Sequence, residues 1–178
     1  MHLGIGAAIS QLGEVAGCLS CPERRTRSFM TDLKLVAFDA EDLNVISAHV
    51  QDAVLQVGDM AYLPSAHRFA AIVNRFDWAK ATGCYGEVGL ERRRTAVRFE
   101  RVLEAKCQGL DLKAKKQCLE LLAIKFDEVD PPGGYVTLFF AGGPAVRLKV
   151  ECIEAEMRDL GAAWTARRKP EHPDVETV

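Results

Sequence analysis

The segment 135–150 alternates apolar residues with other residue types at every second position, and this pattern constrains the fold more than any other part of the chain. Two runs, 135–141 and 145–150, flank the turn-forming triplet Gly142-Gly143-Pro144. Successive side chains of a strand point to opposite faces, so the apolar residues of both runs are expected on one buried face. They are Val136, Leu138, Phe140, Val146, Leu148 and Val150. The sequence therefore predicts an antiparallel β-hairpin.

The residues that follow show a different spacing. Ile153, Met157 and Leu160 recur at intervals of four and three, with Glu154 near the start and Gly161 at the end. Apolar residues at this spacing are typical of one face of an α-helix, and glycine is the common residue just past a helix end. We therefore predict an amphipathic C-terminal helix over about 151–161 that packs on the hairpin.

The first half of the body contains strand patterns and one earlier helix. Residues 33–38 and 68–78 are rich in strand-forming residues, and 54–57 and 61–63 are shorter candidates. Asp39 is suited to an N-cap, with Leu43, Ile46 and Val50 at helical spacing after it. Residues 93–107 alternate as one half-buried strand, and 119–126 form another.

Together these patterns predict an α+β fold with mostly antiparallel strands. The strands are expected to form a twisted sheet or a partly open barrel, with the C-terminal helix and the earlier helix packed on it. A pleckstrin-homology-like barrel is the first architectural expectation. An α+β sheet covered by two helices is the alternative.

The chain has 178 residues, which favours one domain of 30–165 between a poorly ordered N-terminal extension, 1–29, and a frayed tail, 166–178. Met30 directly precedes the first strand pattern, so we expect it to be the natural start. The net charge of −2 argues against a nucleic-acid partner, and no apolar run is long enough to span a membrane. We expect a cytoplasmic protein.

The six cysteines are interpreted as mostly free thiols. Cys18 and Cys21 have the spacing of a metal hook, but no second pair follows to complete four ligands. The chain also lacks the common hydrolase, metalloprotease and phosphate-loop motifs. We therefore expect no metal, no cofactor and, on balance, no catalysis.

The string Asn74-Arg75-Phe76-Asp77-Trp78 combines a guanidinium, an amide and a large aromatic at a strand end. Such residues commonly build binding hot spots, so Arg68, Asn74, Arg75 and Trp78 are our candidate binding residues. The alternative is that Phe76 and Trp78 belong to the core and that Arg75 pairs with a carboxylate. Further arginines could add a basic patch, although alternation would split them between faces: Arg92, Arg93, Arg94 and Arg98.

Several motifs, in order along the chain, resemble a known family. They are Asp32-Leu33-Lys34-Leu35, Glu41-Asp42-Leu43, Ser47-Ala48-His49-Val50-Gln51-Asp52-Ala53, Asn74-Arg75-Phe76-Asp77-Trp78, Phe139-Phe140-Ala141-Gly142-Gly143 and Leu148-Lys149-Val150-Glu151-Cys152-Ile153-Glu154-Ala155. The chain is similar, over about 31–164, to the bacterial family catalogued as domain of unknown function 2948. This resemblance implies no activity.

Three functions remain open. The first is a non-catalytic binding or adaptor module that takes a protein or peptide partner, or a second copy of the chain, at a sheet edge. The second is an enzyme acting on an anionic small molecule, with Arg68, Asn74 and Arg75 as anchors and Asp52 or Asp59 as general base. The third is a structural subunit of a larger assembly, with an outward interface. That interface would be built from Tyr135, Thr137 and Phe139.

Overall fold

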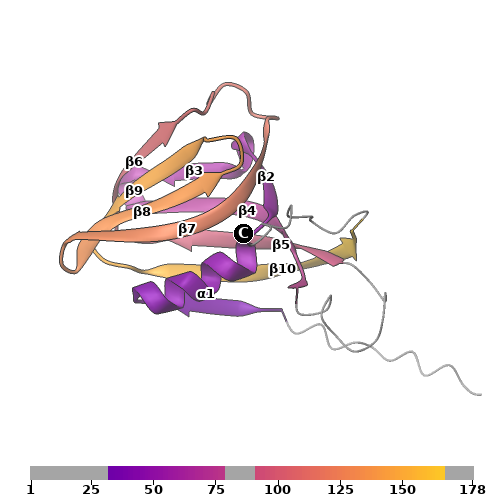
Figure 1. Ribbon diagram of the computed structural model, residues 1–178, viewed down its shortest axis with the longest axis horizontal. Coiled ribbons are helices and arrows are strands. Elements are labelled where there is room, and N and C mark those ends of the chain that lie inside the picture. Colours follow the sequence, from indigo (N-terminus) through magenta and orange to yellow (C-terminus); the bar gives the residue numbers. More distant parts are fainter. Residues whose placement is uncertain (1–31, 79–90, 167–178) are drawn as a thin grey trace, which may run out of the picture.

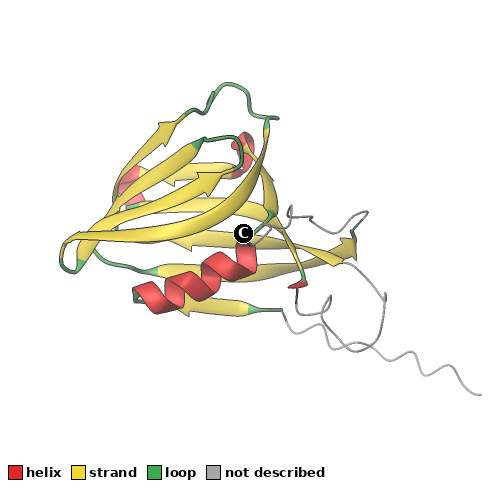
Figure 2. Ribbon diagram, viewed as in Figure 1, coloured by secondary structure: helices red, strands yellow, loops and turns green. Residues whose placement is uncertain are grey.

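The fold is described from a computed structural model that covers residues 32–78 and 91–166. Within these ranges ten strands, one α-helix and two short 3-10 turns follow one another, and every strand pair is antiparallel. The strands dominate the architecture (Figure 2). The elements are β1 (Lys34–Ala37), α1 (Ala40–Val50), β2 (Ala53–Gln56), η1 (Val57–Asp59), β3 (Met60–Leu63), η2 (Pro64–Ala66), β4 (Arg68–Phe76), β5 (Glu91–Phe99), β6 (Val102–Gln108), β7 (Cys118–Asp130), β8 (Gly133–Phe140), β9 (Ala145–Val150) and β10 (Ala155–Thr165).

The strands form one sheet in the order β1-β10-β5-β4-β2-β7-β8-β9-β6, with β3 paired to β4 off this path. The sheet curls so that β7, β8 and β9 lie opposite β4, β5 and β10 (Figure 1). β6, at one end of this order, approaches β3 and the start of β4, where the Tyr62 hydroxyl donates to the Leu103 carbonyl oxygen at 2.9 Å and the Val102 N–H donates to the His67 carbonyl oxygen at 2.8 Å. The mostly antiparallel sheet predicted from the sequence is confirmed, in an open and curled form.

The early helix begins where the sequence predicts. The Asp39 side chain accepts a hydrogen bond from the Asp42 backbone N–H at 2.8 Å, which satisfies one of the free N–H groups of the first turn. Its apolar stripe of Leu43, Ile46 and Val50 is buried against the core. The helix contacts β7, β1 and β4, and so covers the side of the curl between the two layers.

The C-terminal hairpin is also confirmed. β8 and β9 pair across the turn at Gly142 and Gly143, both of which have positive φ. The predicted inner residues of both strands are all buried, while Arg147 and Lys149 stay exposed. The alternation of apolar and polar residues, together with a turn that glycine can adopt, is sufficient to set this register.

The predicted C-terminal helix is wrong, because residues 155–165 form β10. β10 lies between β1 and β5, where both edges of its backbone find hydrogen-bond partners. Ile153 and Met157 are buried as expected, but they fit a period of two as well as a helical period, and Leu160 is 45% exposed. Gly161, with φ +74°, lies in the irregularity between Asp159 and Ala163 and does not end a helix. The pleckstrin-homology-like expectation relied on that helix and is not supported.

The single strand predicted over 93–107 is two strands. The chain turns at Arg101, whose φ of +58° breaks the extended backbone between β5 and β6. In one uninterrupted strand Leu103 would share the buried face of Val97 and Phe99. The turn reverses this order, so Val102 is buried and Leu103 is 41% exposed. β5 then pairs with β4 and β10, whereas β6 pairs with β9.

The predicted extension 1–29, the start at Met30 and most of the tail 166–178 lie outside the described residues. Cys18, Cys21 and Cys84 lie outside them as well, while Cys107, Cys118 and Cys152 are free thiols. Among the helices of the described ranges, none has the length and apolar character needed to cross a membrane.

Candidate functional site

The four candidate binding residues lie on or next to β4, but the structure does not bring them together. Arg68 begins the strand and Arg75 lies seven residues later, which corresponds to about 23 Å along an extended chain. Side chains alternate, so Arg68 and Asn74 lie on the outer face of the curl, whereas Arg75 points into its interior. Trp78 packs its ring edge-on against Phe76, with 4.7 Å between ring centroids. The expectation that these residues share one surface is not supported.

Arg75 is held in a buried charge network at one end of the interior. Its Nε and Nη2 atoms donate to the two oxygens of Asp159 at 3.0 and 2.7 Å, and the two side chains are 4% and 2% exposed. The Thr95 hydroxyl donates to the same carboxylate at 2.7 Å, and the Leu33 N–H donates at 3.3 Å. One carboxylate thus joins β4, β5, β10 and the residue before β1.

The hydrogen bonds around Asp159 decide its charge. Burial alone would raise its pKa, but donation from Arg75 and Thr95, together with the charge of Arg75, holds the pKa below the ordinary value of 3.8. His49 lies nearby on α1, and burial, followed by the charge of Arg75, lowers its pKa below 6.5. The network is therefore built to hold Asp159 ionised and His49 neutral.

A second buried pair lies beside the first. Arg93 Nε donates to Asp77 Oδ2 at 2.8 Å, with side-chain exposures of 6% and 9%. Burial works against the charge of Arg93, but the hydrogen bond and the charge of Asp77 raise its pKa above the ordinary value. Within the described residues every buried side-chain nitrogen and oxygen has a hydrogen-bond partner. We interpret these pairs as structural, as the sequence analysis allowed for Arg75.

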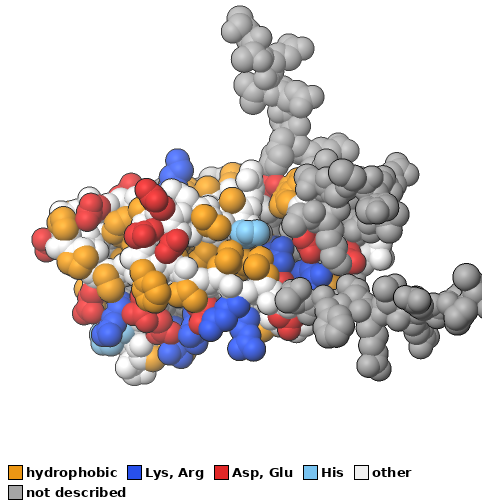
Figure 3. Space-filling model, turned by 90° about the horizontal axis from the view of Figure 1, so that it is seen from below, with side chains coloured by type: hydrophobic (Ala, Val, Ile, Leu, Met, Phe, Trp, Pro, Cys, Tyr) orange, Lys and Arg blue, Asp and Glu red, His pale blue; other side chains and the backbone are white. Residues whose placement is uncertain are grey.

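The outer face of β1, β10, β5 and β4 carries the remaining charges of these strands. Alternation puts Arg93 inside and its neighbours Arg92 and Arg94 outside. The cationic side chains of this outer face are Lys34, Arg68, Arg92, Arg94, Arg98 and Arg158, and the carboxylates on it or directly beside it are Asp32, Glu100, Glu154 and Glu156. We call this surface the arginine face. In Figure 3 blue side chains gather along the lower margin of the described surface.

Only some of these cations are neutralised. Arg68 binds both oxygens of Glu100 at 2.8 and 3.0 Å, and Arg98 binds Glu156 at 3.0 Å. The Arg92 guanidinium donates to the carbonyl oxygen of Asn74 at 3.0 Å. In the described part of the chain, the exposed side chains of Arg94 and Arg158 form no ion pair. The arginine face thus has a positive excess on a chain whose net charge is −2.

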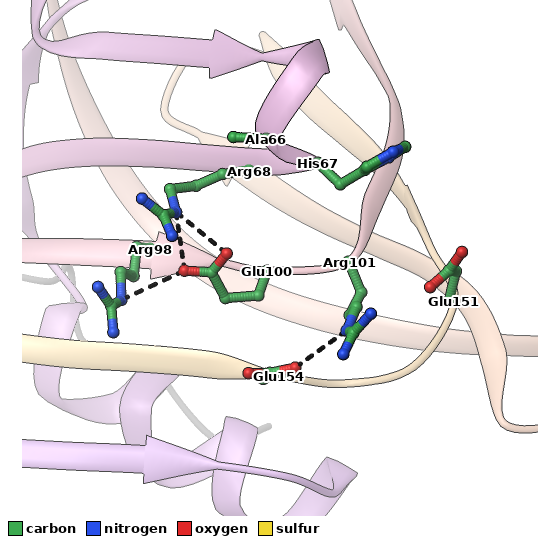
Figure 4. A pocket seen from close by; sticks show the side chains of 8 residues that line it. All are labelled: Ala66, His67, Arg68, Arg98, Glu100, Arg101, Glu151 and Glu154. Atoms are coloured by element: carbon green, nitrogen blue, oxygen red, sulfur yellow. Dashed lines mark hydrogen bonds and ion pairs between the residues drawn. The ribbon is translucent and has the colours of Figure 1, made fainter.

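A polar cleft of about 520 Å³ adjoins the arginine face, where β4 begins and β5 ends. Figure 4 shows Arg68 and Arg98 directed at the Glu100 carboxylate, and Arg101 directed at Glu154. His67 and Glu151 stand on the other side of the cleft. The cleft therefore offers cationic hydrogen-bond donors and anionic acceptors. Of the four candidate binding residues, only Arg68 lines it.

Sequence reasoning missed most of this cleft. Its residues come from η2 and the start of β4, from the end of β5 and the β5–β6 turn, and from the link between β9 and β10, which are far apart in sequence. His67 and Arg101 have positive φ, at 47° and 58°, and these backbone conformations bring the turns to the cleft. Histidine adopts that conformation more often than most residues, but arginine shows no such preference, and neither residue alone signals a turn in the sequence.

The other proposed catalytic groups are also separated. Asp52 is buried at the end of α1, and Asp59 accepts a hydrogen bond from the Gln56 N–H at 3.2 Å. Neither lines the cleft. Among residues 32–78 and 91–166, no cluster of His, Cys, Asp and Glu has the makings of a metal site.

A family model described as a protein of unknown function (DUF2948) matches residues 33–172. The chain belongs to this family, as its motifs indicated. No curated protein and no solved structure matches the chain significantly.

Proposed function

We propose that this protein is a non-catalytic cytoplasmic binding module, and that its arginine face binds an acidic segment of a protein partner. The observation that carries the proposal is the positive excess of that face, where Arg94 and Arg158 are exposed and form no ion pair with any residue of 32–78 or 91–166. Exposed guanidinium groups in a flat array suit carboxylate recognition, because each can bind two oxygens. Free Cys107, Cys118 and Cys152 suit a reducing compartment.

Apolar side chains on the same face support a protein partner. Val36, Leu160 and Trp164 are 41%, 45% and 41% exposed, and register pairing places Trp164 beside Arg92. Interfaces combine such apolar contacts with arginine and aromatic hot spots. Glu100 and Glu156 lie among the arginines and would repel a carboxylate as much as a phosphate, so charge does not separate the two classes of partner. The exposed apolar side chains are the reason why we favour an acidic protein segment over nucleic acid.

Affinity purification from the source cell, with cross-linking, tests this proposal. The variant Arg94→Glu/Arg158→Glu reverses the two unpaired charges, and Lys125→Glu on exposed β7 is the matched control. We expect a partner that wild type and the control retain, that the face variant loses, and whose cross-links map to Lys34. Retention of the same proteins by all three chains would contradict the proposal.

A direct binding assay separates the two classes of partner. Labelled single-stranded DNA is titrated with wild type and with the face variant at physiological salt. The proposal predicts no binding that depends on the arginine face. If DNA binds and the face variant loses it, the face is a nucleic-acid surface and the protein-partner proposal fails.

One observation favours a second candidate, an enzyme acting on an anionic small molecule. The cleft volume of about 520 Å³ lies within the range of about 300–1,000 Å³ that is usual for small-molecule sites. We rank it second because Glu100, Glu154 and Glu151 balance the three arginines of the cleft. Calorimetric titration with inorganic phosphate, with Arg68→Ala as the control, would reveal an anion site, and absence of heat would remove this candidate.

A further inference from the structure

The free edges of β3 and β6 leave a gap on the side of the curled sheet away from β1. In the described residues β3 pairs only with β4, and β6 pairs only with β9. The edges touch at the Tyr62–Leu103 hydrogen bond, and the Val102 N–H donates to the His67 carbonyl oxygen at 2.8 Å. Beyond this contact a slot of about 260 Å³ opens between the strands. Unpaired edges of this kind are sites where an extended chain adds to a sheet.

The slot is mainly apolar, and its inner end is lined by residues of the core. Its walls include Met60 and Tyr62 of β3, Phe69 of β4, Ala105 of β6 and Leu112. The Leu112 side chain, in the loop between β6 and β7, is 53% exposed at the opening. The volume is smaller than the range of about 300–1,000 Å³ of small-molecule sites. It suits one large apolar side chain better than a cofactor or metabolite.

Charge indicates what accompanies that side chain. Lys115 is the only charged residue that lines the slot within the described ranges, and its loop also carries exposed Lys113 and Lys116. The loop's one carboxylate, Asp111, accepts a hydrogen bond from the Lys113 backbone N–H. An occupant with acidic residues next to its apolar anchor would therefore meet a complementary rim.

The slot also continues the arginine face. Cross-strand register places Arg98 beside Ala70, and Ala70 beside Ala61, which lines the slot. The two alanines present no long side chain between the arginines and the slot. An extended segment on the arginine face can thus cross β4 and β3 and reach the slot on a continuous surface.

We propose that the slot between β3 and β6 anchors one large apolar side chain of an extended, acidic peptide segment. This inference rests on the proposed function, because the same acidic partner would lie across the arginine face. It adds the anchor: a leucine-like or aromatic side chain in the slot, with carboxylates against Lys113, Lys115 and Lys116.

Selection from a display library of random ten-residue peptides, with the full chain as target, tests the slot. We expect enriched peptides to carry one large apolar residue with at least two acidic residues within four positions. A fluorescein-labelled copy of the most enriched peptide then serves as the probe in anisotropy titrations. No enrichment, or apolar peptides without acidic residues, would overturn the inference.

Matched variants place the bound peptide. Ala105→Trp fills the slot, and we expect the labelled peptide to bind about tenfold more weakly. Leu112→Ala changes an exposed loop residue that should not affect folding, so it tests the slot even if Ala105→Trp misfolds. Lys115→Glu reverses the positive charge at the rim of the slot. Each should weaken binding about threefold or more. Leu122→Ala and Lys125→Glu on β7 are the controls and should leave binding unchanged. Equal binding by Leu112→Ala and Leu122→Ala would overturn the inference.

Two further outcomes separate this inference from the proposed function. If wild type and the Arg94→Glu/Arg158→Glu variant bind the peptide equally, the slot inference is supported and the proposed role of the arginine face is contradicted. If that variant loses its cellular partner while Ala105→Trp retains it, only the slot inference fails. Light scattering that shows a dimer abolished by Ala105→Trp would assign the slot to a second copy and overturn the peptide occupant.

Discussion

The ion pairs on the two faces of the same strands differ in burial and, we propose, in purpose. Inside the curl, Arg75–Asp159 and Arg93–Asp77 are almost fully buried and are supported by further hydrogen bonds. Outside, the Arg98–Glu156 pair of β5 and β10 has side chains that are 45% and 19% exposed. A buried charge that loses its partner is costly, whereas an exposed pair contributes little. Charge inside therefore stabilises the fold, whereas the charges outside contribute little to stability and include those that we propose bind a partner.

Removing Asp159 should lower the free energy of unfolding more than the other changes below that are not on β5. A small loss would contradict the comparison between the inner and outer pairs. Asp159→Ala leaves Arg75 buried without its carboxylate and removes the acceptor for Thr95 and Leu33. We expect the free energy of unfolding to fall by about 3–5 kcal/mol in urea denaturation. The double variant Arg75→Leu/Asp159→Leu should lose less, because no unpaired charge remains buried. A loss below about 1 kcal/mol for Asp159→Ala would show that the pair is not structural.

The pH dependence of stability should come from the same network. The pKa of Asp159 is lowered in the folded state, so its contribution is present above the unfolded value and is lost as pH falls through the folded value, below 3.8. The pKa of His49 is also lowered, so the folded state resists its protonation and stability falls as pH drops below 6.5. The urea concentration at the unfolding midpoint, measured from pH 8 to pH 3, should therefore decrease first below pH 6.5 and again below pH 3.8.

Nuclear magnetic resonance checks the histidine part of that prediction. The imidazole signals of His49 should titrate with a midpoint below 6.5, because burial and then Arg75 disfavour its charged form. The variant His49→Gln should retain the loss of stability below pH 3.8 and lose the one that begins below pH 6.5. A midpoint for His49 above 6.5 would contradict the described position of Arg75.

The exposed pairs should give the smallest effects. Glu154→Gln removes the partner of Arg101 across the cleft, at an exposed position. We expect the free energy of unfolding to change by no more than about 1 kcal/mol in urea denaturation. A loss as large as that of Asp159→Ala would remove the distinction between the two faces.

The sequence predicted the parts of the fold that local pattern decides. The Asp39 cap, the stripe of Leu43, Ile46 and Val50, and the hairpin with its glycine turn are all confirmed. Each combines a regular apolar period with a residue suited to the cap or turn. The prediction that alternation splits Arg92, Arg93 and Arg94 between the two faces of the strand is also confirmed.

The rest depended on long-range pairing. Ile153 and Met157 fit both a strand and a helix, and only the neighbours β1 and β5 make residues 155–165 a strand. The burial of Asp159 had no local signal, because its buried partners Arg75 and Thr95 are far away in sequence. The period-two series Ile153, Ala155 and Met157 was the local pattern that fits β10. The cleft and slot are assembled by the curl of the sheet and had no local signal.

The adjacent residues Arg93 and Arg94 test the central claim most directly, because they undergo the same substitution on opposite faces of β5. The measurement is the free energy of unfolding of Arg93→Ala and Arg94→Ala. We predict that Arg93→Ala, which leaves Asp77 buried and unpaired, lowers it by about 3–5 kcal/mol. Arg94→Ala should change it by less than about 0.5 kcal/mol. Equal losses for the two variants, or a larger loss for Arg94→Ala, would contradict the account.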